Sequence, residues 1–235
     1  EGVFEMLRQS DSSGVFQLES GLFQGLLKEV KPTRFEDIIA LVALGRPGPM
    51  MMTGDFVKGK HGGEVKYIHP ALEPILNSTY GVMLYQEQVM RVASELAGFS
   101  LAEADLLRRA MGKKKAEVIA GMKDKFISGA IAKGVEESTA REIFSLIERF
   151  AGYGFNAAHS AAYALISYQT AYLKCHYPVE FMAALMTSFM EHTGKITEYI
   201  MTCRQMGIEI LSPDINEGDY RFTPYEGNIR YGLAA

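Results

Sequence analysis

SLAEADLLRRAMGKKK, residues 100–115, contains the start, the body and the end of one α-helix. Ser100 and Glu103 stand at the capping-box spacing, in which each side chain accepts a hydrogen bond from a backbone N–H of the first turn. Apolar residues at helical spacing follow and lead to Gly112, which ends the helix. Similar start and stop signals, a polar capping residue before apolar residues at helical spacing and a glycine or proline after them, recur along most of the chain. The sequence therefore predicts a fold of short helices.

Outside this stretch, apolar residues recur at helical spacing between glycines and prolines. We expect helices over residues 21–30, 37–44, 82–96, 116–132, 139–150, 159–176, 178–190 and 193–206. Only after residue 207 does the period change to two, and the turn sequence Glu226-Gly227-Asn228 predicts a small β-hairpin there. The expected fold is mainly α, with a multi-helix domain over residues 1–207 and a short β segment over 208–235 that begins the next region.

The composition excludes several classes of protein. With 48% hydrophobic and 22% charged residues over 235 positions, the chain has enough apolar side chains for a packed core, which excludes disorder and fibres. No apolar run approaches the roughly 18 residues that span a bilayer, so we expect no membrane partner. The two cysteines, Cys175 and Cys203, lie in expected helices, which is typical of a reduced, cytoplasmic protein. The chain begins without Met and inside a helical pattern, so we expect it to be a piece of a longer chain.

Positive charge is concentrated in one stretch of the sequence. The whole chain has 24 Lys and Arg against 28 Asp and Glu, a net charge of −4 that gives no bulk attraction for a polyanion. Residues 106–125 hold seven cations and two anions, a local charge of +5, which leaves −9 for the remainder. Such an uneven distribution indicates an anionic partner at one face of the molecule.

The cations of this stretch stand where two expected helices meet. Arg108 and Arg109 lie near the end of the first helix, and the N–H groups that begin the second could converge on phosphates with Lys113, Lys114 and Lys115. The alternative is that these charges only solvate two surface helices, which is the usual role of a charge run. The residues alone leave both interpretations open.

A second candidate site is the glycine-aromatic loop, FAGYGFNAAHSAAY over residues 150–163. Tyr153 or Phe155 could stack on a nucleobase, and Asn156 could hydrogen-bond a base edge or a sugar. His159 could donate to a phosphate at the positive end of the helix that follows. The alternative is a glycine-hinged connection whose aromatic rings fill a core and whose histidine caps or packs against the helix.

The sequence lacks the motifs of a self-sufficient catalytic site. Two-metal phosphoryl transfer needs carboxylates that converge at about 4 Å, usually from neighbouring strands, and no Asp-x-Asp lies on an apolar strand. Cys and His lack zinc-site spacing, and neither a Gly-x-x-x-x-Gly-Lys-Ser/Thr phosphate loop nor a Gly-x-Ser-x-Gly elbow is present. These residues therefore predict a helical anion-binding module with no metal site and no catalytic residue of its own.

Six stretches in the same order resemble the bacterial C-family replicative DNA polymerases, the family of the DNA polymerase III α subunit. They are VFQLES (15–20), FEDIIAL (35–41), RPGP (46–49), YQEQVM (85–90), ADLLRRAMGKKK (104–115) and the loop at 150–163. The resemblance implies that the helical part is a fingers domain, with the junction to the palm near residues 1–20. It also implies that the intact subunit is a nucleotidyltransferase that performs template-directed DNA synthesis with Mg²⁺. The aspartates that bind this ion would lie in the palm, outside this piece, which would be inactive alone.

The resemblance also assigns site residues. Those expected to border the incoming nucleotide are Arg108, Arg109, Tyr153, Asn156 and His159, and those expected to face DNA or phosphate are Lys113, Lys114 and Lys115. The chain departs from the family pattern at Ala157-Ala158, where a lysine and a serine are usual, and at Gly45, where an aromatic residue is usual. Gln86, Glu87 and Gln88 match a family motif, but their residue types indicate only solvated positions.

The expected partners are primer-template DNA, dNTP and the remaining domains of the α subunit. Sliding clamp, proofreading exonuclease and clamp loader would bind mostly through regions outside this chain. Two alternatives come from other classes: a stand-alone, non-catalytic helical module that binds nucleic acid, and a purely structural interaction module. The first would bind DNA with a steep salt dependence and no response to dNTP, and the second would not bind it at all.

Overall fold

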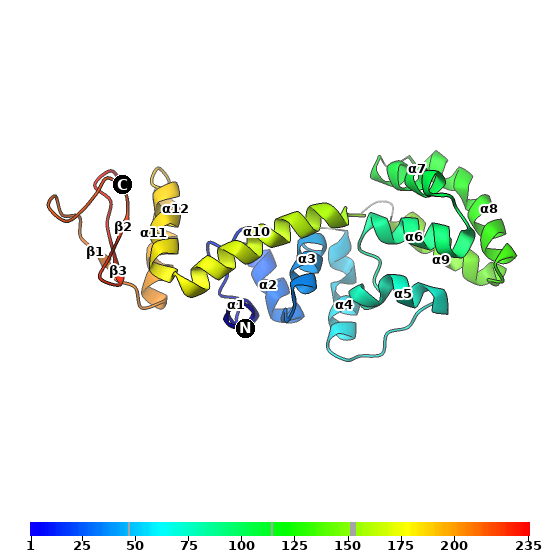
Figure 1. The fold of residues 1–235 in the computed structure, drawn as a ribbon, viewed down its shortest axis with the longest axis horizontal. Coiled ribbons are helices and arrows are strands. Elements are labelled where there is room, and N and C mark those ends of the chain that lie inside the picture. Colours follow the sequence, from blue (N-terminus) through cyan, green and yellow to red (C-terminus); the bar gives the residue numbers. More distant parts are fainter. Residues whose placement is uncertain (47, 114, 151–153) are drawn as a thin grey trace. The chain divides into compact units, whose positions relative to one another are not determined.

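The computed structural model of the chain describes residues 1–46, 48–113, 115–150 and 154–235. The helices are α1 (Gly2–Arg8), α2 (Gly21–Val30), α3 (Phe35–Leu44), α4 (Thr53–Lys60), α5 (Glu73–Leu76), α6 (Gln86–Ala97), α7 (Leu101–Gly112), α8 (Ala116–Ala132), α9 (Glu137–Phe150), α10 (Ala157–His176), α11 (Pro178–Ser188) and α12 (Thr193–Gln205). Short 3₁₀ turns at Pro49–Met52, Pro70–Leu72 and Asn77–Thr79 separate some of them. The strands β1 (Ile210–Leu211), β2 (Thr223–Tyr225) and β3 (Asn228–Arg230) follow α12 (Figure 1). The mainly α fold is confirmed.

The contacts divide the chain into two compact units. One contains residues 1–33 and 165–235, and the other contains residues 34–164. The boundary between them falls inside α10. The division at residue 207, between a fingers domain and a following β segment, stays a prediction. In the part of the chain that is described, no helix is long and apolar enough to cross a membrane.

The core of the 34–164 unit lies among four consecutive helices. α6 packs against α7 and α8, and α8 packs against α9. Phe126 of α8 is fully buried, with its ring centroid 5.3 Å from that of Phe144 in α9 and 6.1 Å from that of Phe99. Burial of each such ring contributes about 1.5–3 kcal/mol, so this core holds α6 to α9 in fixed positions.

The predicted capping box at the start of α7 is confirmed, whereas α6 begins at a different residue from the one predicted. The Ser100 backbone N–H donates to Glu103 at 2.9 Å, and the Glu103 N–H donates to the Ser100 hydroxyl at 3.3 Å. The helix predicted over 82–96 begins instead at Gln86. Its expected first turn is not helical because Tyr85 forms a parallel bridge with Phe155, a partner that lies far away in sequence.

The other unit has a core made by α11, α12 and the small sheet. Met182, Ile196, Tyr199 and Phe222 are buried there. β2 and β3 form the predicted antiparallel hairpin, and its two turn residues have φ of 47° at Glu226 and 79° at Gly227. Positive φ at both central positions characterises the type I′ turn, whose twist matches that of paired strands. β1 pairs in parallel with β3 and completes the sheet.

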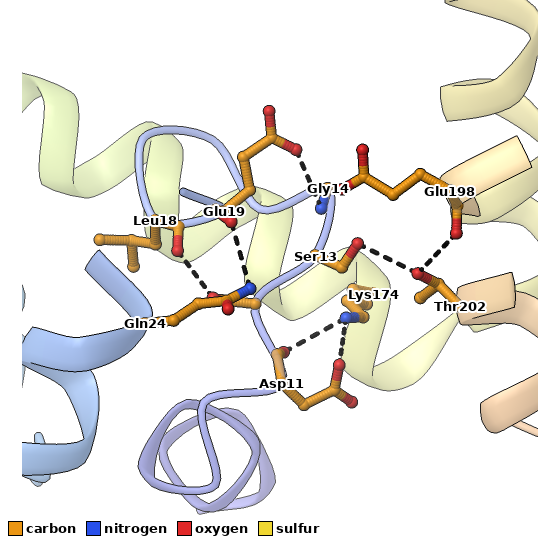
Figure 2. Close-up of polar contacts among 10 residues, drawn as sticks. Asp11, Ser13, Gly14, Leu18, Glu19, Gln24, Lys174, Glu198 and Thr202 are labelled. Atoms are coloured by element: carbon orange, nitrogen blue, oxygen red, sulfur yellow. Dashed lines mark hydrogen bonds and ion pairs between the residues drawn. The ribbon is translucent and has the colours of Figure 1, made fainter. Parts of the chain in front are cut away.

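Residues 10–20 of the same unit form a loop held by side chains from distant helices (Figure 2). Lys174 of α10 is buried, and its ammonium donates to the carboxylate of Asp11 and to the Asp11 carbonyl at 3.2 Å. The hydroxyls of Ser13 and Thr202 lie 3.2 Å apart. Because the ammonium is buried while the Asp11 carboxylate is half exposed, the pair holds this loop to α10.

Candidate functional site

The glycine-aromatic loop is attached to the segment that precedes α6. The Phe155 N–H donates to the Leu84 carbonyl at 3.4 Å, and the Gln86 N–H donates to the Phe155 carbonyl at 2.9 Å. The Gln86 side-chain amide also donates to the Gly154 carbonyl at 3.1 Å. A Cβ on Gly154 would lie 2.5 Å from a ring carbon of Phe150, so only glycine fits at this crossing.

The carboxylate of Glu87, a residue of α6, lies at the N-terminus of α10. Its carboxylate accepts hydrogen bonds from the Asn156 side-chain amide at 2.8 Å and from the Ala157 backbone N–H at 2.9 Å. Asn156 in turn accepts from the His159 N–H at 2.8 Å, which is the geometry of a helix N-cap. The positive end of α10, where a phosphate was expected, therefore has the Glu87 carboxylate as its anion.

Gln88, the third residue of the Gln86-Glu87-Gln88 motif, is buried, and its side chain binds the residues that precede α6. Its side-chain oxygen accepts from the backbone N–H groups of Leu84 at 2.8 Å and Tyr85 at 2.9 Å, and its amide donates to the Thr79 hydroxyl at 2.8 Å. Burial raises the pKa of the Tyr85 hydroxyl far above its ordinary value, and the neighbouring Glu87 carboxylate adds to this effect. Gln86 and Glu87 thus hold the loop directly, and Gln88 holds the segment before α6 to which the loop is attached, roles that their residue types did not indicate.

Arg46, Phe155, His159 and Tyr163 form a group that we call the Phe155 cluster. The Arg46 guanidinium carbon lies 3.8 Å from the centroid of the Phe155 ring. The exposed His159 ring meets Phe155 edge-on, with centroids 5.2 Å apart, and stacks on Tyr163 at 4.2 Å. Asn156 and His159 lie next to each other at the start of α10, whereas Tyr153 lies outside the described residues.

The two arginines of α7 share one carboxylate. Arg108 Nε donates to one oxygen of Asp105 at 2.8 Å, and Arg109 Nε donates to the other at 2.6 Å. The two guanidinium groups lower the pKa of the Asp105 carboxyl below its ordinary value. In this structure the cations predicted to meet a triphosphate are thus held next to each other by an anion of their own helix.

Other cations of the basic stretch are also paired. Lys123 donates to Glu148 of α9 at 3.1 Å, and Lys125 pairs with Glu103. These acids and Asp105 lie outside residues 106–125, and counting all three lowers the local charge from +5 to +2.

The remaining positive charge lies where α7 meets α8. Among the residues that the structure describes, Lys113 and Lys115 are exposed and have no acidic side chain within ion-pair distance. Lys114 lies outside the described residues. Among the described residues, the cations of the stretch without an acidic partner are therefore gathered at the helix junction, and both interpretations of the stretch stay open.

The unit also contains an open cavity of about 670 Å³ that the sequence did not indicate. It lies between residues 48–83 and the end of α9, with Met51, Met52 and Met83 in its apolar wall. Of the predicted site residues, those that the structure describes do not line it. Within the described ranges, no group of three or more His, Cys, Asp or Glu side chains could hold a metal ion.

Sequence reasoning missed Arg46 and Glu87 as members of the site. Both lie in stretches that carry the family resemblance, RPGP and YQEQVM, so the signal was present in the sequence. Their contacts with Phe155 and Asn156 join residues about 70 to 110 positions apart, which no spacing rule predicts.

Known proteins match the chain closely. Residues 1–134 match the family model of the bacterial DNA polymerase III alpha subunit finger domain. The chain is 55% identical over 241 residues to the DNA polymerase III subunit alpha of Pasteurella multocida, an alignment that covers 99% of this chain and 21% of that protein. The corresponding protein of Escherichia coli (strain K12) is 51% identical with the same coverage, and that of Halalkalibacterium halodurans is 48% identical over 232 residues. The chain spans about a fifth of the length of the curated relatives it matches.

Proposed function

Because this chain belongs to the bacterial DNA polymerase III α subunits, as their fingers domain, we propose that it binds dNTP and primer-template DNA during template-directed synthesis by the full-length subunit. The observation that carries the proposal is the junction of Glu87 with Asn156, which places the exposed His159 ring beside Asn156 and Phe155. A rigid, partly aromatic surface with polar side chains is suited to a nucleotide.

Each site residue has a proposed task. Tyr153, Asn156 and His159 border the nucleotide, and Arg108 and Arg109 bind the triphosphate. Lys113, Lys114 and Lys115 bind the DNA backbone, because two of these ammonium groups lack a protein partner among the described residues. Asp105 keeps the two guanidinium groups together, so that one phosphate can meet both.

Divalent metal ions are general cofactors of DNA polymerases. We propose that Mg²⁺ is held by palm aspartates of the full-length subunit, where it would neutralise the triphosphate and activate the primer terminus. The residues of this chain bind and orient the nucleotide, and the isolated chain is inactive. We further propose a cytoplasmic location, and that clamp, exonuclease and clamp loader bind other parts of the subunit.

The test uses the full-length polymerase with Arg109→Ala and His159→Ala. Removal of one preorganised donor lowers a catalytic rate about 10²- to 10³-fold, and we expect a loss of this size in single-turnover incorporation. Arg141→Ala is the matched control, because this arginine pairs with Glu137 on the exposed face of α9. If both variants incorporate dNTP within twofold of the control, the proposal is wrong.

A binding titration separates the alternatives. Labelled primer-template is titrated at two salt concentrations, with and without dNTP. Fingers of a polymerase bind the junction more tightly when the correct dNTP is present, whereas a stand-alone nucleic-acid-binding module binds without regard to dNTP. A structural module does not bind DNA at either salt concentration.

A further inference from the structure

We infer that Arg46 is a phosphate-binding residue of the Phe155 cluster, a role that rests on the proposed function of this surface. The phosphate would belong either to the triphosphate of the incoming nucleotide or to the DNA backbone. Both sources present the same chemistry, a tetrahedral oxyanion that a guanidinium can bind with two parallel N–H donors.

Within the part of the chain that the structure describes, Arg46 is held by a contact with an aromatic ring that uses none of its N–H donors. Its guanidinium carbon lies 3.8 Å from the centre of the Phe155 ring, and that ring is buried. A guanidinium over a ring face is attracted to the ring itself, so this contact does not use its N–H donors as hydrogen bonds to an acceptor would. Arg46 is exposed, and within the described ranges no carboxylate lies within ion-pair distance of it.

The α7 arginines differ from Arg46 in this respect. Arg108 and Arg109 each direct Nε toward Asp105, so part of their hydrogen-bonding capacity and charge is used inside the protein. An anion that approaches them meets a carboxylate as well. An anion that approaches Arg46 meets a guanidinium on an apolar support, and none of its five N–H donors has an acceptor among the described residues.

The hydrogen bonds at the start of α10 give a second reason why a phosphate at the Phe155 cluster needs a side-chain donor. Glu87 and Asn156 occupy the backbone N–H groups of Ala157 and His159, so these two groups are not available to a phosphate. The ring that supports Arg46 is the same Phe155 ring that His159 contacts edge-on at 5.2 Å. Arg46 and His159 therefore contact the same ring, and together they supply side-chain donors for a phosphate at the Phe155 cluster.

The experiment compares Arg46→Gln and Arg46→Lys in the full-length polymerase. We expect Arg46→Gln to weaken phosphate binding about 10- to 100-fold, the size of one charged hydrogen-bonding partner. Arg46→Lys keeps the charge and loses the planar fork, so we expect a smaller loss. Arg141→Gln is the control for an exposed arginine of the same unit.

Two readouts distinguish the sources of the phosphate. A raised KM for dNTP with unchanged primer-template affinity identifies the triphosphate. Weaker primer-template binding without dNTP, with a salt dependence reduced by about one phosphate contact, identifies the DNA backbone. If Arg46→Gln changes both quantities less than twofold beyond the control, the inference is wrong.

Controls separate this inference from other causes. Phe155→Leu keeps an apolar side chain under Arg46 and removes the ring face, so we expect it to reproduce the Arg46→Lys effect on binding. A loss of melting temperature without a change in KM or in primer-template affinity would assign Arg46 to packing alone and overturn the inference. Normal Arg46→Gln kinetics beside impaired His159→Ala kinetics would reject this inference and leave the proposed function standing.

Discussion

Glu87→Ala should release the start of α10 from α6. The carboxylate accepts one hydrogen bond from the Asn156 amide and one from the Ala157 N–H, at 2.8 and 2.9 Å. Hydrogen bonds to a charged group contribute about 1.5–3 kcal/mol each, and partial exposure of Glu87 reduces this, so we expect a local loss of about 2–4 kcal/mol. Glu87→Gln retains one acceptor oxygen, and we expect about half that loss.

Hydrogen exchange measures this local loss directly. Opening of the helix start exposes the Ala157 and His159 amides, so peptides that cover residues 154–163 of the full-length polymerase should exchange faster. A loss of 2–4 kcal/mol corresponds to a fall in protection of about 30- to 1,000-fold. Peptides from α9, which do not contact Glu87 through a hydrogen bond, should keep their protection.

Glu95→Ala is the matched control on the same helix. Glu95 pairs with Arg91 on the exposed side of α6 at 3.1 Å, a kind of pair that contributes about 0.5 kcal/mol or less. The reasoning is refuted if protection of residues 154–163 in Glu87→Ala stays within threefold of the unmodified protein. It is equally refuted if Glu95→Ala lowers that protection as much.

The same structure supports three further predictions. Gly129→Ala should lower the free energy of unfolding by about 1–3 kcal/mol, because its Cβ would lie 2.1 Å from the Ala97 carbonyl oxygen. Gly121→Ala in the same helix meets no atom within 4 Å and should raise the free energy of unfolding by about 0.5–1 kcal/mol. Thermal unfolding of the two variants measures both effects. Alanine at both Lys113 and Lys115 should lower the slope of log affinity against log salt for DNA by about 1.8, and an unchanged slope contradicts their role. Lys125 and the cap at Ser100 lower the pKa of Glu103 to about 2, so its stabilising effect is complete above pH 4.5 and is lost as the pH falls through 2. The difference in melting temperature between the protein and Glu103→Gln should therefore shrink as the pH falls from 6 to 2.

Local interactions explain why parts of the fold were predictable. The Ser100 and Glu103 cap closes within one turn, and the type I′ turn at Glu226 and Gly227 depends on two adjacent residues. Both follow from short-range hydrogen bonding and backbone conformation. The α6 start was wrongly predicted at residue 82, because pairing of Tyr85 with Phe155 overrides the helical spacing of the apolar residues there.

The sequence proposed a set of candidate site residues, which stays a prediction, and could not give their arrangement. The sequence named Asn156, His159 and the cations of the basic stretch, and the family resemblance is confirmed. It could not show that Glu87 fills the anion position at α10, because this contact joins residues 69 and 70 positions apart. For the same reason it gave no sign that Arg46 rests on Phe155.

Residue order alone was enough to predict the helical class, the terminal hairpin, the family and the uneven distribution of charge along the chain. Which charges are available to a partner followed only from the packing of the helices. Helix caps and turns form between near neighbours, so residue order is sufficient to predict them. An ion pair such as Lys123 with Glu148 forms only because α8 packs against α9. That packing depends on contacts between side chains far apart in the sequence, which the spacing of residues along one helix does not predict.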